Sequence, residues 1–413
     1  MIGLGYVGLP LAVLFSKKYK VIGYDIDISR VEELKNLNDR TNEVDSIKLK
    51  NTFLNNFEIT SNLDKISDCN IYIITVPTPI DKNKKPDLSY LLNATKETGK
   101  NLSKGDLVIF ESTVYPGCTE EECVPILEKT SSLTYNKDFF CGYSPERINP
   151  GDKKNTIEKI VKVTSGSSKF SADVVDKLYK SVITAGTHRA QSIKVAEASK
   201  AIENAQRDLN ISFVNELSII FDKMGIDTTD VLEAASTKWN FLNFRPGLVG
   251  GHCISVDPYY LTHKAECLGY NPQVILSGRK VNENMAKFVA NKLLLKMKEK
   301  CIEIKDAEIL ILGITYKENC PDTRNTKIPE VYNVLKKNGS KVSVYDPYAS
   351  DKQVKKDYSI NLVKNLKKYD GIILAVAHNK FKKLNFEQLL KDSKSVIFDL
   401  KSVLKKSKTD VRL

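Results

Sequence analysis

The sequence is poor in histidine and has no closely spaced pair of cysteines. Its 413 residues include 4 histidines and 8 cysteines, and the cysteines form no CxxC motif. Structural zinc sites usually rely on such pairs, and disulfide frameworks are typical of short secreted domains. In a chain of this length, scattered thiols therefore indicate reduced cysteines in a cytoplasmic protein, with no metal site.

The sequence also lacks a long apolar segment and a compact basic stripe. Its longest apolar runs have the length of a strand, short of the roughly 20 residues that a membrane-spanning helix needs. Residues 1–15 are apolar, but no basic stretch precedes them, so they do not read as a signal peptide. Nucleic-acid binding is not expected either, because the basic residues are not clustered with aromatic ones.

Positive charge is what the sequence has in excess. It has 63 lysines and arginines against 51 aspartates and glutamates, a formal net charge of +12. Many isolated lysines are typical of a solvated, lysine-rich surface. The alternative is a field that attracts anionic ligands such as dinucleotides or sugar diphosphates, and the composition leaves both open. The length suits two domains, or three.

Short apolar runs alternate with helical patterns at both ends of the chain. Residues 21–25, 71–77 and 107–111 read as strands buried on both faces, as in a parallel sheet. After about residue 299 the pattern returns. The candidates there are strands at 308–314, 341–346, 371–376 and 396–400 and a helix at 328–337.

A long helical segment separates these two regions. Residues 192–224 contain neither glycine nor proline, and Gly225 follows where a helix-ending glycine is expected. Such a helix would be roughly 50 Å long and could connect two domains. We therefore predict an α/β fold of two Rossmann-like, doubly wound lobes joined by a long central helix and a helical middle domain. The predicted boundaries are 1–190, 191–298 and 299–413.

Gly3, Gly5 and Gly8 form a GxGxxG motif. The first glycine allows a tight turn, the second lets the backbone approach a pyrophosphate, and the third lets the following helix pack on the strand. Asp25 ends the next strand about 20 residues later, where a carboxylate binds the adenosine ribose diol. Because that carboxylate would repel a 2′-phosphate, the motif predicts NAD as the cofactor.

The start of this motif is unusually short. A first strand normally supplies about five residues before the first glycine, and here two residues precede Gly3. We expect the central strand of the first sheet to be incomplete, which would weaken both NAD binding and stability.

A glycine turn leads into a cysteine in the second half of the chain. Gly250 and Gly251 precede His252 and Cys253, and Asp257 follows four residues after the cysteine. A cysteine nucleophile needs exposure, room for a tetrahedral adduct and a neighbouring group that handles protons. The glycines and Asp257 would meet these needs. The alternative, from the residues alone, is a small buried cysteine.

Lys200 and Asn204 lie four residues apart in the predicted central helix and would share one face. A cation and an amide that project together can hold an oxyanion or a water molecule. The alternatives are an ordinary surface face or an ion pair of Lys200 with Glu197 or Glu203.

Several motifs, in this order, resemble the UDP-glucose/GDP-mannose dehydrogenase family, and the match extends almost from end to end. They are GLGYVGLP from Gly3, PTPID from Pro77, ESTVYPG from Glu111, SPER from Ser144, the helix with Lys200 and Asn204, the GGHC turn with Asp257, and Lys317 followed by DTR ending at Arg324.

The resemblance implies an NAD-dependent enzyme that oxidises the C6 alcohol of a UDP-hexose to a carboxylate in two hydride transfers. Cys253 would add to the intermediate aldehyde, and the thiohemiacetal would be oxidised to a thioester that water hydrolyses. Lys200 and Asn204 would stabilise the oxyanion and position water. Asp257 would share in proton transfer, and Glu146 would assist thioester formation or hydrolysis.

The resemblance also implies the residues that bind ligands. Those expected at NAD are Gly3, Gly5, Tyr6, Val7, Gly8, Asp25, Arg30, Pro77, Thr78, Thr113 and Arg324. Those expected at the UDP-sugar are Arg147, Arg245, Gly250, Tyr259, Lys264 and Lys317. The last lobe, which has no glycine-rich loop, would bind UDP.

The chain departs from the UDP-glucose branch of this family. That branch has a second glutamate shortly after the one in the SPE motif, where this chain has Pro150 and Gly151. The segments SPERINPGDK, FRPGLVGGHC and DPYYLTHKA look more like the branch that acts on UDP-N-acetylhexosamines for bacterial surface polysaccharides. This indicates UDP-N-acetylglucosamine or UDP-N-acetylgalactosamine as the substrate.

Three alternatives stay open. The same chemistry could act on UDP-N-acetylmannosamine or UDP-glucose, because a few side chains decide the substituent at C2. A two-electron dehydrogenase would share the first lobe and the long helix without a covalent role for Cys253. A non-catalytic binding module would have no use for Lys200, Asn204, Cys253 and Asp257 together. We also expect a homodimer, because the long helix has an apolar face that needs covering.

Overall fold

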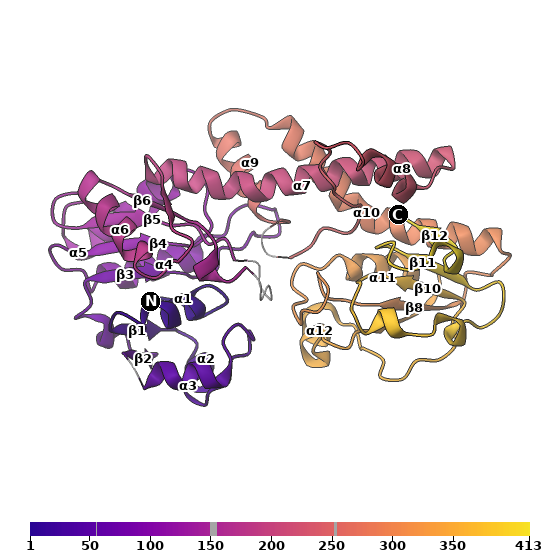
Figure 1. Cartoon of the computed structure of the whole chain (residues 1–413), viewed down its shortest axis with the longest axis horizontal. Helices are drawn as coiled ribbons and strands as arrows, with labels where there is room; N and C mark the ends of the chain where they lie inside the picture. Colours follow the sequence, from indigo (N-terminus) through magenta and orange to yellow (C-terminus); the bar gives the residue numbers. More distant parts are fainter. Residues whose placement is uncertain (55, 149–154, 252–253) are drawn as a thin grey trace. The chain divides into compact units, whose positions relative to one another are not determined.

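The structure is a computed structural model that describes residues 1–54, 56–148, 155–251 and 254–413 (Figure 1). The chain forms two compact units. Unit 1 consists of Met1–Glu203 and Tyr259–Tyr270, and unit 2 of Asn204–Pro258 and Asn271–Leu413. The residues of the predicted middle domain are therefore distributed over both units.

Unit 1 is built on a largely parallel sheet. Its strands are β1 (Val21–Tyr24), β2 (Phe57–Thr60), β3 (Ile71–Ile74), β4 (Leu107–Phe110), β5 (Phe140–Tyr143), β6 (Lys162–Gly166) and β7 (Thr187–Arg189). β1 pairs with β2, and the others follow in the order β3-β4-β5-β6-β7. Every pair is parallel except β5 with β6, which is antiparallel.

The first residues of the chain connect the two parts of this sheet. Ile2 forms parallel bridges to Tyr24 at the end of β1 and to Ile74 at the end of β3. Gly3 N donates to Tyr24 O at 2.8 Å, and Thr75 N donates to Ile2 O at 2.9 Å. The carboxyl ends of β1 and β3 therefore lie on either side of the glycine motif.

Helices cover the sheet of unit 1. They are α1 (Gly8–Phe15), α2 (Ile28–Lys35), α3 (Ser46–Phe53), α4 (Ser89–Gly99), α5 (Val124–Ser131) and α6 (Lys169–Lys180). One core cluster joins Leu11 and Phe15 of α1 to Ile73, Ile109 and Tyr179. A second joins other residues of α1 to α2, α3 and β2. Each large apolar side chain buried in this way contributes about 2 kcal/mol.

Unit 2 contains an all-parallel sheet of the order β12-β11-β10-β8-β9. Its strands are β8 (Glu308–Leu312), β9 (Lys341–Tyr345), β10 (Gly371–Leu374), β11 (Val396–Asp399) and β12 (Val411–Arg412), and its helices include α8 (Thr228–Ala235), α10 (Gln273–Glu299), α11 (Ile328–Lys337) and α12 (Asp351–Tyr358). Alternate residues of β8 enter two different cores: Ile309 and Ile311 one of them, Leu310 and Leu312 the other. Both faces of this sheet are therefore buried, as is typical of a parallel sheet.

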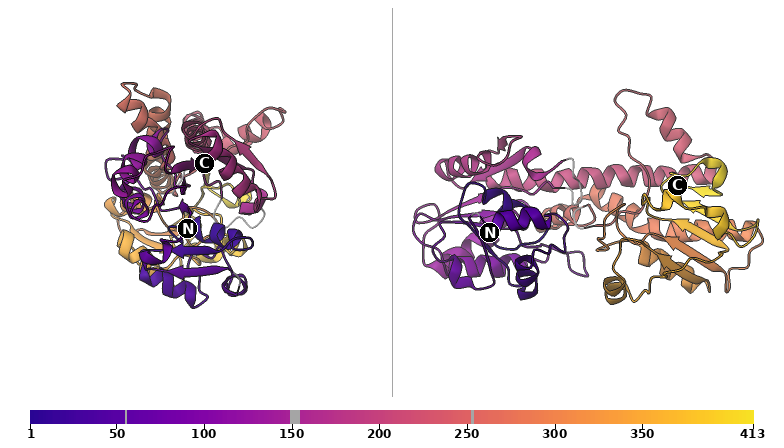
Figure 2. Two further views of the ribbon diagram at one scale, coloured as in Figure 1. Left: turned by 90° about the vertical axis from the view of Figure 1, so that its left-hand side faces the viewer. Right: turned by 60° about the horizontal axis from the view of Figure 1, so that its bottom comes forward.

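Two helices have residues in both units. α7 (Ile193–Met224) is the predicted long helix, and Figure 2 shows it without interruption. Gly225 follows it with φ +69°, the left-handed conformation expected of a helix-ending glycine. α9 (Asp257–Cys267) begins in unit 2 and continues in unit 1. The predicted α/β class, with two Rossmann-like lobes and a long helix, is confirmed.

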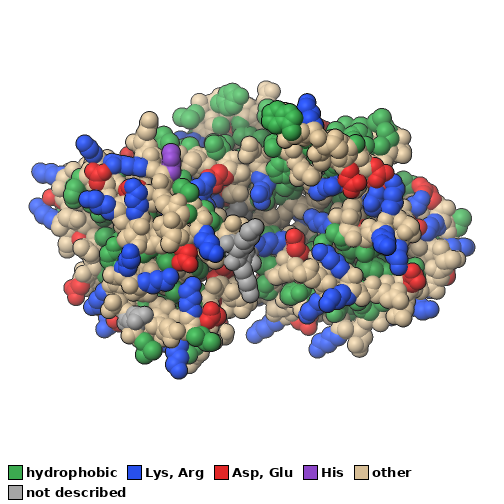
Figure 3. Space-filling model, in the orientation of Figure 1, with side chains coloured by type: hydrophobic (Ala, Val, Ile, Leu, Met, Phe, Trp, Pro, Cys, Tyr) green, Lys and Arg blue, Asp and Glu red, His purple; other side chains and the backbone are tan. Residues whose placement is uncertain are grey.

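Lysine and arginine side chains are scattered among acidic ones over the face shown in Figure 3. This distribution is typical of the solvated, lysine-rich surface that the composition suggested. Among the described helices, none has the length and apolarity to cross a membrane. The described residues also contain no cluster of metal-ligating side chains.

Candidate active site

The glycine motif has the geometry that a dinucleotide needs. Gly3 has φ +91°, and a Cβ atom on Gly8 would lie 1.9 Å from Gly3 O, so neither position accepts a side chain. A Cβ atom on Gly5 would meet no atom within 4 Å, which leaves open space above the loop. The first turn of α1 has no acidic side chain and no side-chain cap, so its amide groups are available to a pyrophosphate.

Two charged side chains hold the loop at Leu4. Asp25, at the end of β1, accepts a hydrogen bond from Leu4 N at 2.8 Å and another from Asp27 N at 2.9 Å. Arg30 is 2% exposed, and its Nε donates to Leu4 O at 2.9 Å while its Nη2 pairs with Asp39 at 2.7 Å. A carboxylate has room for further hydrogen bonds, so Asp25 can also receive a ribose diol. The direct contact of Arg30 with NAD stays a prediction.

Replacing Asp25 by asparagine is expected to raise the KM for NAD about tenfold, the effect of losing one charge-assisted hydrogen bond. Initial rates at varied NAD and NADP would measure it, and the preference for NAD over NADP should fall. Asp45→Asn is the matched control, because Asp45 is an exposed cap of α3 in the same unit. A KM for NAD that stays unchanged in Asp25→Asn would contradict the assignment.

The loops after β3 and β4 are tied to each other and to α9. Thr78 Oγ1 donates to Thr113 O at 2.6 Å, and Ser112 Oγ donates to Val76 O at 2.6 Å. Tyr260 of α9 donates to Thr78 O at 2.9 Å. Since these loops follow the carboxyl ends of the strands beside the glycine motif, they lie at the edge where a Rossmann lobe binds its cofactor. The contacts of Pro77, Thr78 and Thr113 with NAD stay predictions.

Glu197 fixes α7 to the loop that follows Thr113. Its carboxylate accepts hydrogen bonds from Gly117 N at 2.5 Å and Thr119 N at 2.9 Å, and it is fully buried. Burial raises the pKa of Glu197 to about 7, although the hydrogen bonds act in the opposite direction. The sequence suggested Glu197 only as a surface ion-pair partner for Lys200. Its burial contradicts a surface role.

The structure brings Asn204 and Asp257 together within unit 2. Asn204 Nδ2 donates to Asp257 Oδ2 at 2.6 Å, and Asp257 is 2% exposed. Lys200, one turn earlier in α7, is 6% exposed. The surface reading of this helix face is therefore wrong for Lys200. His252 and Cys253 lie outside the described residues.

The glycine turn before Cys253 packs tightly against another loop of unit 2. A Cβ atom on Gly250 would lie 2.7 Å from Asn325 O, and one on Gly251, which has φ +88°, would lie 2.9 Å from the Tyr316 ring. Gly250 lines a cavity with Tyr316, Lys317 and Lys401. Lys317 was predicted at the UDP-sugar, whereas Lys401 was missed because its strand-end position carries no motif.

A carboxylate also follows the second strand of the unit 2 sheet. Asp346 accepts hydrogen bonds from Ile314 N at 2.7 Å and from His378 Nε2 at 3.1 Å. Its position at the end of a second strand resembles that of Asp25 in unit 1. The Asp346 carboxylate, however, is already hydrogen-bonded to the fully buried His378. This lobe therefore does not offer a free carboxylate to a dinucleotide ribose. Arg324 pairs with Asp322 at 2.6 Å, and its contact with the cofactor stays a prediction.

Glu146 lies after β5 in unit 1. One oxygen, Oε1, accepts hydrogen bonds from Arg147 N at 2.6 Å and Ile148 N at 2.5 Å, and Oε2 lies 3.5 Å from Lys162 Nζ. The Arg147 guanidinium pairs with Glu203 of α7 at 2.7 Å. Glu203, which the sequence suggested as a partner for Lys200, is thus bound to Arg147.

The remaining predicted sugar contacts have different surroundings. Arg245 is exposed in unit 2. In unit 1, Tyr259 is buried beneath Lys84, whose Nζ lies 5.4 Å from the ring centre. Lys264 pairs with Glu121 at 2.5 Å and lies 5.4 Å above the Tyr115 ring. Their contacts with the sugar stay predictions.

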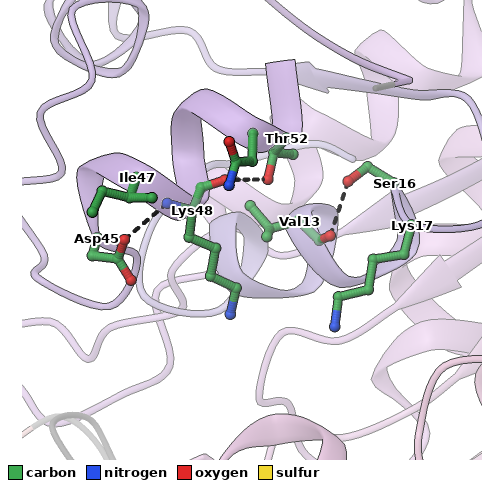
Figure 4. Close-up of a pocket in the computed structure, with 8 residues that line it drawn as sticks. Val13, Ser16, Lys17, Asp45, Ile47, Lys48 and Thr52 are labelled. Carbon is green, nitrogen blue, oxygen red and sulfur yellow. Dashed lines mark hydrogen bonds between the residues drawn. The ribbon is translucent and has the colours of Figure 1, made fainter. Parts of the chain in front are cut away.

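Another cavity of unit 1 lies between α1 and α3 and is unconnected to the motifs (Figure 4). The Ser16 and Thr52 hydroxyls in it donate to backbone carbonyls at 2.9 and 2.7 Å. Its lining includes none of the predicted site residues that the structure describes.

Comparisons with known proteins cover most of the chain. Models of the UDP-glucose/GDP-mannose dehydrogenase family match it in three parts: the NAD binding domain at residues 1–183, the central domain at 194–284 and the UDP binding domain at 310–406. The NAD model covers the glycine motif and Asp25. The UDP model covers Lys317 and Lys401.

Individual relatives match over almost their full lengths. The chain is 54% identical to a UDP-N-acetyl-D-glucosamine 6-dehydrogenase of Pseudomonas aeruginosa and 53% identical to one of Salmonella typhi, over 100% of this chain and 98% of each relative. The solved structure of a UDP-D-ManNAc dehydrogenase from Pyrococcus horikoshii is 30% identical, with a TM-score of 0.89 over 100% of this chain and 97% of that one.

Proposed function

The chain belongs to the UDP-glucose/GDP-mannose dehydrogenase family, and we propose that it oxidises the C6 hydroxymethyl group of UDP-N-acetyl-D-glucosamine to a carboxylate. It is an NAD-dependent nucleotide-sugar dehydrogenase. The observation that carries the choice of sugar is the identity of 54% and 53%, over the whole chain, to two enzymes named for that substrate. Five relatives named UDP-N-acetyl-D-mannosamine dehydrogenase are 32% or 33% identical to the chain.

The residues of α7 and of the turn before α9 carry the proposed chemistry. Bound NAD supplies the hydride acceptor for both oxidations. Cys253 adds to the C6 aldehyde and retains the sugar as a thioester until water releases the acid. Lys200 and Asn204 stabilise the oxyanion of the tetrahedral adducts. The hydrogen bond from Asn204 fixes the Asp257 carboxylate, and Asp257 exchanges protons with the reacting groups.

Two lysines that line a cavity of unit 2 support recognition of the nucleotide. Lys317 and Lys401 line the cavity beside Gly250, and two ammonium groups attract a diphosphate. Arg147, Arg245, Gly250, Tyr259 and Lys264 remain our proposed contacts to the sugar side. The described cysteines are all free thiols, which supports a reducing compartment such as the cytoplasm.

The stoichiometry of the reaction tests the proposal. The purified chain is mixed with NAD and, separately, with UDP-N-acetylglucosamine, UDP-N-acetylgalactosamine, UDP-N-acetylmannosamine and UDP-glucose. We expect two NADH per sugar and a uronate product, with the highest kcat/KM on UDP-N-acetylglucosamine. One NADH per sugar would favour a two-electron dehydrogenase, and a higher kcat/KM on another sugar would change the substrate.

A homodimer that buries one face of α7 is also proposed. Phe213, Ile220 and Met224 are spaced seven and four residues apart, so they lie on one face of the helix. They are 57%, 44% and 61% exposed, and exposed apolar faces of this kind mark protein–protein contacts.

Replacing Phe213 by glutamate is expected to convert a dimer to a monomer, because a charge would be buried in the interface. Light scattering at micromolar concentration measures the mass. The control is Arg207→Glu, which introduces the same side chain at an exposed position of the same helix, about 120° around the axis from Phe213. A monomeric mass for the unchanged chain would contradict the proposal.

A further inference from the structure

Unit 1 contains a buried cluster of charged side chains beside Glu146. Glu111 directly follows β4, Lys162 is the first residue of β6, and Tyr179 belongs to α6. Glu111 is 1%, Lys162 3% and Tyr179 0% exposed. Three separate elements therefore place ionisable groups in the interior next to a residue of the proposed active site.

Lys162 is the centre of this cluster. Its Nζ donates to Glu111 Oε2 at 2.6 Å and to Pro145 O at 2.9 Å, and lies 3.5 Å from Glu146 Oε2. The Tyr179 hydroxyl donates to the other oxygen of Glu111. Both Glu111 oxygens are therefore engaged, and one ammonium group lies between two carboxylates.

Lys162 is the group that stabilises a negative charge on the second carboxylate oxygen of Glu146, Oε2. Glu146 Oε1 is held by two backbone amides, whereas Oε2 is buried and accepts no hydrogen bond from the described residues. A buried carboxylate oxygen without a hydrogen bond is costly when ionised. The charge of Lys162, at 3.5 Å, is the compensation that the described residues place beside it.

The cluster has one positive charge for two potential negative ones. In the interior two carboxylates do not ionise independently, because each destabilises the charge of the other. Burial raises the pKa of Glu111 to about 7, with Glu146 acting in the same direction and Lys162 in the opposite one. Burial holds the pKa of Tyr179 well above its usual range, so its hydroxyl remains a donor.

We propose that Lys162 is a positioning residue for Glu146, and that Glu111, held by Tyr179, competes for the charge of Lys162 and so sets the readiness of Glu146 to accept a proton. This rests on the proposed function. In thioester hydrolysis, water adds to the carbonyl carbon and its proton passes to Glu146 Oε2. A C–O bond forms, the C–S bond breaks, and the Cys253 thiolate leaves. Glu146 must be ionised for this step.

The groups around the cluster come from four elements. They are Glu111 after β4, Glu146 after β5, Lys162 in β6 and Tyr179 in α6. Asp176, also in α6, is bound to Thr164, Thr187 and Lys180. It gives a matched control, because it is buried in the same helix and pairs with β6 without contacting Lys162 in the hydrogen bonds described.

Two substitutions are expected to move the acid limb of the kcat–pH profile in opposite directions. In Glu111→Gln, the Lys162 charge no longer pairs with a second carboxylate. The ionised form of Glu146 is therefore stabilised, and the limb shifts about one pH unit lower. In Lys162→Met, two carboxylates lose their cation, so the limb shifts about one unit or more higher. Tyr179→Phe should give a smaller shift in the direction of Glu111→Gln, because an ionised Glu111 loses a hydrogen bond.

The profile is measured from pH 5 to 10 on the full chain with saturating NAD and UDP-N-acetylglucosamine, and circular dichroism confirms folding. Lys162→Arg should restore the limb if Lys162→Met is active, and Asp176→Asn should leave it in place. If Lys162→Met does not fold, Glu111→Gln and Tyr179→Phe still show whether the acid limb shifts to lower pH as expected. Acid limbs that coincide with that of the unchanged chain, or that shift in the same direction in Glu111→Gln and Lys162→Met, would overturn the inference. The proposed function would still stand if the unchanged chain forms two NADH per sugar. An unchanged chain that forms no NADH would overturn both.

Discussion

Replacing Cys253 by alanine is expected to lower the rate of uronate formation by about 10³-fold or more, the scale of removing a covalent nucleophile. Without the thiol the aldehyde cannot become a thioester, so NADH formed per sugar should fall from two to at most one. The first oxidation needs no covalent bond to the protein. It depends on the glycine motif and the loops after β3 and β4, which the substitution leaves intact.

Chromatographic separation of sugar products, with NADH counted by absorbance, measures both effects. Cys267→Ala is the matched control, since Cys267 is an exposed thiol in the helix that follows Cys253. Full conversion to the acid by Cys253→Ala would refute the thioester scheme and leave a dehydrogenase that hydrates its aldehyde without covalent help.

Replacing Asp208 by alanine is expected to destabilise unit 2 by about 2–3 kcal/mol, because it removes one of the two carboxylates that pair with the buried Arg279 guanidinium and leaves Glu283 as the other. Asp208 of α7 accepts hydrogen bonds from Arg279 Nη1 at 2.6 Å and Asn282 Nδ2 at 2.7 Å, both in α10. Asp208 is fully buried and Arg279 is 2% exposed. This network fixes the helix that carries Asn204 to the longest helix lying wholly within unit 2.

Urea denaturation followed by circular dichroism tests this expectation. Asp222→Ala is the control, because Asp222 pairs with Lys292 between the same two helices at 2.8 Å while its side chain is 35% exposed. That pair should contribute less than about 1 kcal/mol. Equal losses of stability in the two variants would show that burial of the Asp208 network has no special weight.

Much of the fold could be predicted because strands and helix ends are determined by apolar runs and glycines that are close together in the sequence. The helix at 192–224 is observed at Ile193–Met224 and the helix at 328–337 at Ile328–Lys337, and every predicted strand has an observed counterpart. Helix α10 was not identified separately. Gly278 interrupts its pattern, and a Cβ atom at this position would lie 2.7 Å from the Leu209 side chain of α7.

The partners of buried charges could not be predicted. Lys162 and Glu111 are 51 residues apart, and Gly117 and Glu197 are 80 apart. Nothing in the local sequence distinguishes such a lysine or glutamate from a solvated one. The antiparallel pairing of β5 with β6 was missed for a similar reason, since direction depends on the connection between strands rather than on the residues within them.

Each unit is built from two separate segments of the chain, and this affects the order in which the units can fold during synthesis. Unit 1 is not complete at Glu203, because residues Tyr259–Tyr270 belong to it. Tyr260, which donates to Thr78 O, and Lys264, which pairs with Glu121, are translated after the first 55 residues of unit 2. On the ribosome, the loops after β3 and β4 of the N-terminal lobe therefore lack their contacts with α9 until that helix emerges. A nascent chain halted before residue 259 should remain sensitive to protease at those loops.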